Sequence, residues 1–303
     1  MNKKSELDKK IEVIKDIFDI NKILNIKLNK NYIQKYYFVN KIPYSIFHTN
    51  TDLIYMGISR DGKFKTADLL EAARTVEKYI TKDTKNILEL ATGRGATSFY
   101  LAKKYPKVNF YGIDISKAQL ELAFNKAKKL NNYHPTFGDY HNLKKFKSKH
   151  FDISFAIEAL CYSNNKYKVL TEVHLKLKDG GFFIIFDGYA KNNKKLTENE
   201  KLAKILLEKG MAINKFDTYE NFLKEVKKSK FKVEFEEDVS KYIIPTMEKF
   251  EKISKIYFKI RIFSKILSNL LPKEFIYNTI PGYLGPTLMK LKLYKYMITI
   301  LRK

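Results

Sequence analysis

The sequence Glu89-Leu90-Ala91-Thr92-Gly93-Arg94-Gly95 joins a predicted strand over 86–90 to a predicted helix that runs through 98–104. Its two glycines let the backbone turn sharply and point amide groups at a ligand from a helix N-terminus. Nineteen residues beyond the second glycine, Asp114 stands at the end of the next predicted strand. A carboxylate placed there can accept both hydroxyl hydrogens of a ribose. The arrangement therefore predicts a site for an adenosine-type cofactor.

The acidic residue Glu89 favours a methionine-derived cofactor over a nicotinamide one. A carboxylate just before the turn would repel a pyrophosphate, whereas it suits the ammonium group of a methionine moiety. The window 91–96 matches the Gly-x-Gly-x-x-Gly pattern of dinucleotide-binding proteins only if two alanines stand in for glycines. Taken singly, Asp114 could merely cap a helix and Asp139 could be an ordinary turn residue. The interpretation depends on these residues occurring together.

From residue 86 onward, strands alternate with helices, which is typical of a parallel sheet. Strands are predicted at 86–90, 108–113, 135–137, 151–157, 182–186, 231–235 and 294–301, and helices at 66–81, 98–104, from Ser116, 166–177 and 217–228. The pattern predicts an α/β fold with a Rossmann-like, seven-stranded, mostly parallel sheet and helices on both faces. Residues 5–35 are predicted to be helical, and 36–66 to be aromatic and irregular.

The sheet pattern and the segments around it predict that the chain has four parts. These are a helical and aromatic N-terminal cap at 1–85, the core at 86–240, an inserted helical lid at 241–290 and a final strand at 291–303. One amphipathic helix is expected over 250–270, because apolar residues recur there every three or four positions: Ile253, Ile256, Ile260, Phe263, Leu267 and Leu270. We expect this apolar seam to pack on the domain; contact with a lipid surface is the alternative.

In order and spacing, the motifs resemble those of the class I S-adenosylmethionine-dependent methyltransferases. The glycine turn resembles their first motif, with Ala91 where the family usually has glycine, and 111–116 resembles the second. The segment Phe137-Gly138-Asp139-Tyr140 resembles the one that holds the adenine, and 179–181 resembles the turn before strand five. The resemblance implies S-adenosylmethionine as cofactor and S-adenosylhomocysteine as product. The implied cofactor-binding residues are Glu89, Ala91, Gly93, Gly95, Asp114, Ile115, Asp139, Tyr140 and Glu158.

The segment 155–163 resembles the corresponding motif of the sterol C-methyltransferase and cyclopropane fatty acid synthase-like group of small-molecule enzymes. The resemblance implies a small hydrophobic acceptor, such as a lipid, sterol or isoprenoid. Glu158 ends the fourth strand and is the first candidate for a base or a cation-stabilising acid, with a loop-positioning role as the alternative. His48 is the second catalytic candidate, with a structural role as its alternative. The candidate pocket residues are Tyr37, Phe47 and Tyr162.

Composition limits the rival functions. The 303 residues carry a net charge of +25, but of the 58 basic residues only five are arginines: Arg60, Arg74, Arg94, Arg261 and Arg302. Nucleic-acid recognition favours the arginine fork, so we favour compositional drift and expect no specific nucleic acid. A nucleic-acid methyltransferase or binding protein remains the rival of another class. An O- or N-methyltransferase of a natural product is the alternative within the enzyme class.

The single cysteine, Cys161, and the lack of an apolar leader or a long apolar run predict a cytoplasmic protein. Contact with a membrane periphery through 250–270 is the one qualification. No histidine–carboxylate spacing suggests a metal site. The pattern predicts nothing about oligomeric state.

Overall fold

A seven-stranded sheet forms one half of the molecule. In the computed structural model, which describes residues 3–48, 51–192 and 195–303, the sheet order is β3-β2-β1-β4-β5-β7-β6. The first five strands are parallel, and β7 runs antiparallel to both of its neighbours. The strands are β1 (Asn86–Leu90), β2 (Asn109–Asp114), β3 (Tyr133–Phe137), β4 (Phe151–Ile157), β5 (Leu177–Ala190), β6 (Lys232–Asp238) and β7 (Tyr294–Arg302). The predicted Rossmann-like sheet is confirmed.

Helices cover both faces of this sheet, as predicted. Successive side chains of a strand point to opposite faces, and Ile87 and Leu88 accordingly join two different apolar clusters. The cluster of Ile87 contains residues of α5 (Glu71–Glu77), α6 (Ala96–Lys104) and α7 (Lys117–Ala127), and that of Leu88 contains residues of α8 (Lys166–Lys176) and α10 (Tyr219–Lys228). The predicted cap of α7 is confirmed, because the Ser116 side chain accepts a hydrogen bond from the Gln119 amide.

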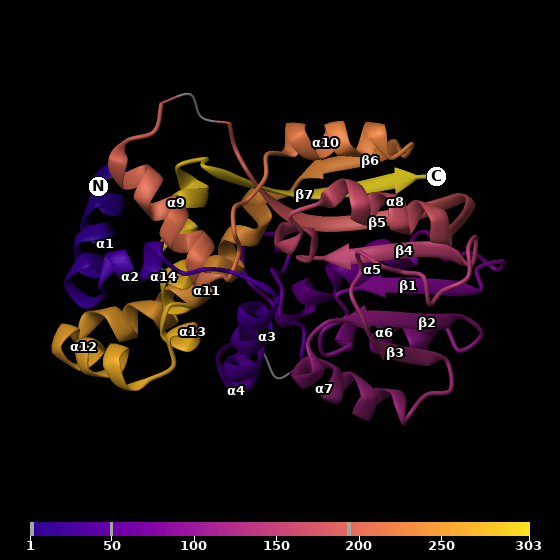
Figure 1. The fold of residues 1–303 in the computed structure, drawn as a ribbon, viewed down its shortest axis with the longest axis horizontal. Coiled ribbons are helices and arrows are strands. Elements are labelled where there is room, and N and C mark those ends of the chain that lie inside the picture. The colour runs from indigo at the N-terminus through magenta and orange to yellow at the C-terminus, as the bar shows by residue number, and fades with distance from the viewer. Residues whose placement is uncertain (1–2, 49–50, 193–194) are drawn as a thin grey trace.

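The remaining helices gather beyond the carboxyl ends of the parallel strands (Figure 1). They are α1 (Lys3–Ile17), α2 (Ile20–Leu24), α3 (Lys30–Val39), α4 (Lys41–Pro43), the π-helical turn η1 (Tyr44–His48), α9 (Glu198–Gly210), α11 (Ser240–Lys259), α12 (Arg261–Leu270), α13 (Lys273–Ile276) and α14 (Thr279–Lys290). The buried Lys10 ammonium joins three of them, since it donates to Glu251 on α11 and to Thr287 on α14. Segments from both ends of the chain thus roof one edge of the sheet.

Several predicted boundaries need correction. The predicted helix over 5–35 is three helices, because the side chains of Asp19 and Asn29 cap new helices at their N-termini. Residues 36–66 are not wholly irregular. They include the end of α3, all of α4 and the π-helical turn η1, and the short helix η2 (Thr66–Leu70) begins at their last residue. Helix α9 was not predicted, although Thr197 and Glu200 form a capping box at its start. Strand β5 is longer than predicted, because it begins at Leu177 and includes residues 179–181, where a turn was expected. Its pairing with β4 shifts register in this region.

The prediction of one continuous helix over 250–270 is wrong. The backbone leaves the helical conformation at Ile260 (φ −104°, ψ 80°), so α11 ends and α12 begins in a new direction. The Ser264 side chain caps this break by donating to carbonyl groups of Tyr257 and Ile260. The expected packing of the seam also fails for four of its six residues, which are exposed: Ile256, Ile260, Phe263 and Leu270. Among the helices that the structure describes, none is both long and apolar enough to span a bilayer.

Candidate active site

Four carboxylates meet at the edge of the sheet where the parallel strands end. Glu89 belongs to β1, Asp114 ends β2, Glu158 follows β4 and Asp187 lies in β5. All four line one cavity of about 900 Å³ between the sheet and the helical roof. Open α/β sheets bind their ligands at this edge. The fold therefore brings residues that are far apart in sequence together on the sheet side of the cavity, here called its floor.

The glycine turn between β1 and α6 adopts left-handed backbone conformations, with φ of 50° at Ala91, 53° at Gly93 and 70° at Gly95. A side chain at Gly93 would meet no atom closer than 3.9 Å, and this residue lines the cavity. Gly95 faces away from it, and a Cβ there would lie 2.0 Å from the Tyr133 hydroxyl. Gly93 thus leaves room for a ligand, whereas Gly95 is required by packing against β3.

The Glu89 carboxyl is held from one side. Its Oε2 accepts hydrogen bonds of 2.6 Å from the hydroxyls of both Thr92 and Ser98. Burial raises the pKa of Glu89 to about 7, against the lowering effect of these two hydroxyls. A cationic group in the cavity would therefore stabilise the ionised form of this buried carboxyl.

Asp114 closes the glycine turn as well as lining the cavity. Its Oδ2 accepts a 2.8 Å hydrogen bond from the Gly93 amide, and its Oδ1 accepts one of 2.7 Å from the Ser116 amide. Burial raises the pKa of Asp114 to about 6. Each carboxylate oxygen retains acceptor capacity, so both can still receive ribose hydroxyls.

Asp139 and Tyr140 form the neighbouring wall. Asp139 Oδ1 accepts from the backbone amide of His141 and lies 2.7 Å from the Nδ1 of the same ring. The Tyr140 hydroxyl donates to the carbonyl of Ala159, which fixes that ring beside the loop after β4. Asp139 and Tyr140 both line the cavity, as does Ile115, which directly follows β2.

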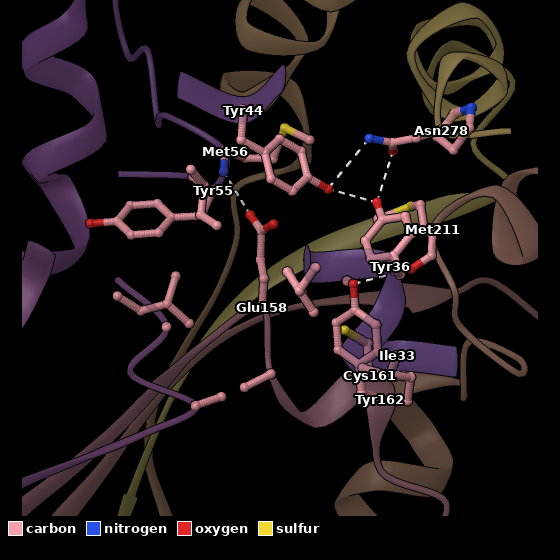
Figure 2. A pocket seen from close by; sticks show the side chains of 18 of the residues that line it. Ile33, Tyr36, Tyr44, Tyr55, Met56, Glu158, Cys161, Tyr162, Met211 and Asn278 are labelled. Carbon is pink, nitrogen blue, oxygen red and sulfur yellow. Dashed lines mark hydrogen bonds between the residues drawn. The ribbon is translucent and has the colours of Figure 1, made fainter. Parts of the chain in front are cut away.

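Glu158 reaches into the middle of the cavity (Figure 2). Its Oε1 accepts a 2.7 Å hydrogen bond from the Met56 amide and one of 2.9 Å from the Tyr296 hydroxyl. Burial raises its pKa to about 7. Its backbone is left-handed, with φ of 49°, a strained conformation for a residue with a side chain. Tertiary contacts therefore hold this carboxyl in place at a local cost.

Asp187 supports the same loop from β5. Its Oδ2 accepts a 3.0 Å hydrogen bond from the Cys161 amide, and burial raises its pKa to about 6. Cys161 is buried beside it, and burial raises the pKa of the thiol well above its usual value. The thiol is therefore protonated at neutral pH and is a poor nucleophile.

Tyrosines from the helical roof and from the loop after β4 form the aromatic side of the cavity. The rings of Tyr37 and Tyr162 lie 6.0 Å apart, and both line it. The hydroxyls of Tyr36 and Tyr44 are 2.6 Å apart, and Asn278 bonds to both of them (Figure 2). This triad ties α3, η1 and the start of α14 together over the site.

Arg94 connects the glycine turn to the roof. Its side chain is fully buried and donates to the Asp52 carboxylate at 2.9 Å, to the Ser45 hydroxyl at 2.7 Å and to the Lys41 carbonyl. On the other side it donates to the Gln119 amide oxygen on α7. Arg94 therefore links the glycine turn to α4 and η1 through direct hydrogen bonds.

The cavity brings together most of the residues singled out from the sequence. Eight of the nine implied cofactor residues line it, with Gly95 as the exception, and Tyr37 and Tyr162 do so too. The side chains of Phe47 and His48 lie outside the described part of the structure. Among the described residues, no three His, Cys, Asp or Glu side chains are arranged so that they could hold a metal ion.

The sequence did not indicate Tyr296, Met56 or Asp187 as site residues, nor the buried contacts of Arg94 with the roof. Asp187 could have been found, because it directly follows the apolar run 182–186 at the carboxyl end of a parallel strand. Tyr296 gave no such signal. It reaches Glu158, which is 138 positions away in the chain, only because β7 pairs with β5.

Comparisons with known proteins agree with this geometry. Residues 81–249 match the family described as "Methyltransferase domain". "Sterol methyltransferase-like 1" of Botryococcus braunii is 26% identical over 226 residues, which cover 70% of this chain and 57% of the relative. The demethylmenaquinone methyltransferase of Thermotoga maritima is 31% identical over 124 residues, which cover 41% of this chain and 52% of the relative. The chain thus spans little more than half the length of either.

Among solved structures, the cyclopropane synthase MmaA2 from Mycobacterium tuberculosis is similar in fold. The TM-score is 0.75 at 14% identity, and the match covers 92% of this chain and all of that one (100%). The fold, the carboxylates at the strand ends and the family match over more than half of the chain lead to one assignment. The chain belongs to the methyltransferase domain family and has the fold of the class I S-adenosylmethionine-dependent enzymes.

Proposed function

We propose that the protein transfers a methyl group from S-adenosylmethionine to a small hydrophobic acceptor, of lipid, sterol or isoprenoid type, inside the cavity. The observation that carries the proposal is the position of Glu158. This buried carboxyl stands between the residues that suit an adenosine cofactor and a largely apolar chamber roofed by α3, η1, α11 and α13.

The residues on the floor suit each part of the cofactor. Asp114 would accept the ribose hydroxyls, and Asp139 with Tyr140 would bind and flank the adenine. Glu89 would pair with the ammonium group through its remaining acceptor capacity, since only one of its oxygens is engaged by hydroxyls. Gly93 presents no side chain to this space. These assignments place the sulfonium on the side toward Glu158.

The size and lining of the chamber support a hydrophobic acceptor. The whole cavity, including the floor that would hold the cofactor, measures about 900 Å³ and lies near the upper end of the range of about 300–1,000 Å³ typical of pockets for small molecules. Its far side is lined by apolar residues of the roof, among them Ile243, Met247, Ile253, Leu267 and Met289. The names of the sterol methyltransferase-like relative and of the cyclopropane synthase are in keeping with such an acceptor.

Glu158 would act either as a base or as the carboxylate that stabilises a positive charge during the reaction. When bound, S-adenosylmethionine would supply an electrophilic methyl group, whose bond to the acceptor would form as its bond to sulfur breaks. An oxygen or nitrogen acceptor would pass its proton to the Glu158 carboxylate. With an alkene acceptor, the same carboxylate and the faces of Tyr37 and Tyr162 would stabilise a cation and then receive its proton. Hydrogen bonds from Met56 and Tyr296 hold the carboxylate for either task.

A direct experiment is to incubate the protein with S-adenosylmethionine carrying a deuterated methyl group and with a total lipid extract. Mass spectrometry should find the label in a lipid, together with an equal amount of S-adenosylhomocysteine. The matched control is Glu158→Gln, which should form far less product while still binding S-adenosylhomocysteine. Absence of label from every lipid, together with label in a water-soluble metabolite extract supplied in a parallel incubation, would contradict the acceptor class.

We further propose that the protein works in the cytoplasm at the periphery of a membrane. A reduced, buried Cys161 is in keeping with that compartment. The exposed apolar residues of the 250–270 segment support the membrane contact.

A further inference from the structure

The short helix α12 turns an apolar face to solvent. Ile262 is 78% exposed and Leu270 is 74% exposed. Together with the end of α11, the helix carries six exposed apolar residues within fifteen positions, here named the α12 patch: Ile256, Ile260, Ile262, Phe263, Ile266 and Leu270. Scattered exposed apolar side chains are ordinary, whereas such clustering marks an interaction surface.

A second exposed apolar group belongs to the other end of the chain. Phe38 on α3, Ile42 on α4 and Ile46 in η1 are each about two-thirds exposed, at 67%, 68% and 68%. We name these three residues the α4 patch. In Figure 1, α4 and α12 both lie along the lower edge of the helical half. The sequence pattern did not indicate this second group.

Both patches adjoin the mouth of the cavity. Ile256 lines the cavity and is also 72% exposed, so it lies where the cavity meets solvent. Pro43 and Tyr44, which lie between Ile42 and Ile46 in the sequence, also line the cavity. Helix α11 contacts η1 directly. The cavity is therefore flanked by exposed apolar residues from two segments of the chain.

The charge around the α12 patch is positive. Six exposed basic residues occur between 252 and 273, and no acidic residue does: Lys252, Lys255, Lys259, Arg261, Lys265 and Lys273. Asp16 and Glu251 neutralise part of this charge through ion pairs with Arg261, Lys265 and Lys255. An apolar face bordered by cations matches the acyl chains and headgroups of an anionic bilayer.

We propose that the α12 and α4 patches dock the protein on an anionic lipid bilayer, with the mouth of the cavity facing the lipid. The patches insert their apolar side chains at the level of the acyl boundary, and the lysines contact the headgroups. The docking assigns residues and an orientation to the membrane contact proposed above, and only the entry of a lipid acceptor from the bilayer rests on the proposed methyl transfer.

Docking is tested by flotation of the protein with vesicles, without cofactor or acceptor. Vesicles of phosphatidylglycerol mixed with phosphatidylcholine should bind the protein, and more weakly as salt is raised. Ile262→Ser combined with Leu270→Ser should weaken binding by roughly tenfold or more, because two inserted side chains are lost. Ile42→Ser combined with Ile46→Ser should weaken it similarly.

The matched control is Leu175→Ser combined with Ile205→Ser, two exposed apolar residues on α8 and α9 outside both patches. It should bind like the unchanged protein. Equal binding by all three double variants would overturn the proposal, as would a dimer in solution that the α12 substitutions dissolve. Since no methyl transfer is measured, a wrong acceptor class would leave this result unchanged.

Discussion

The hydroxyl of Tyr296 lies 2.9 Å from Oε1 of Glu158 and donates a hydrogen bond to it. The bond joins the antiparallel strand β7 to the loop after β4, on the far side of β5 in the sheet order. It stabilises the ionised form of a carboxyl whose pKa burial has raised to about 7. Tyr296 is thus a positioning residue that also adjusts the proton affinity of Glu158.

This relationship predicts a shift in the pH–rate profile. If Glu158 accepts the proton of the acceptor, kcat should rise with pH through about 7, because only the ionised carboxylate acts as a base. Tyr296→Phe removes a donor to the carboxylate, so the midpoint should move upward by about one pH unit. Initial rates of S-adenosylhomocysteine formation at saturating lipid extract would measure it. An unchanged midpoint would remove Tyr296 from this role.

Glu158 should also make stability depend on pH. Its pKa is about 7 in the folded protein and near its ordinary value of 4.5 when unfolded, so the folded state binds more protons between these limits. Ionising the carboxyl therefore costs stability as pH rises, on the order of 3 kcal/mol across the interval. Urea denaturation should show a smaller decline for Glu158→Gln than for the unchanged protein. Parallel declines would contradict the burial argument.

Arg94 should be essential to the fold as well as to the site. Arg94→Met removes the fully buried partner of an ion pair with Asp52, which is partly exposed and keeps Lys126, and it leaves the Lys41 carbonyl without that donor. Unfolding free energy should fall by about 2–4 kcal/mol, because several buried hydrogen bonds of a charged group are lost. Arg60→Met, which breaks a half-exposed pair with Glu237, is the matched control and should cost at most about 1 kcal/mol. Similar losses of unfolding free energy in the two variants would contradict this role of the Arg94 contacts.

Gly95 should tolerate no side chain, for a reason unrelated to the cofactor. A Cβ at this position would lie 2.0 Å from the Tyr133 hydroxyl, so Gly95→Ala should destabilise the protein by about 1–3 kcal/mol. Adding Tyr133→Phe should restore part of the loss, because the closest atom is removed. Thermal unfolding of the single and double variants would measure the coupling. Purely additive losses would place the strain in the backbone instead.

The sequence predicted the sheet well because local signals specify it. Apolar runs such as 151–157 form buried strands, and the glycine turn has few alternative structures. The roof was predicted poorly, because its helices depend on contacts between distant segments. The heptad-like spacing over 250–270 suggested one helix, yet the break at Ile260 is fixed by the Tyr257–Ser264 contacts.

The same division holds within the site. Asp114 and Glu158 could be predicted because each follows an apolar strand directly. Tyr296 and Arg94 could not, since their partners are set by the insertion of β7 and by the folding of the N-terminal segment over the turn. Local patterns thus locate the strand ends, and tertiary contacts decide what reaches them.

The central claim is that the glycine turn and Asp114 together bind the adenosine part of the cofactor. Calorimetric titration with S-adenosylhomocysteine tests it most directly. We predict saturable binding at one site per chain, weakened by about 1–3 kcal/mol in Asp114→Ala through the loss of charge-assisted hydrogen bonds. An absence of binding to the unchanged protein, or an affinity that Asp114→Ala leaves untouched, would contradict it.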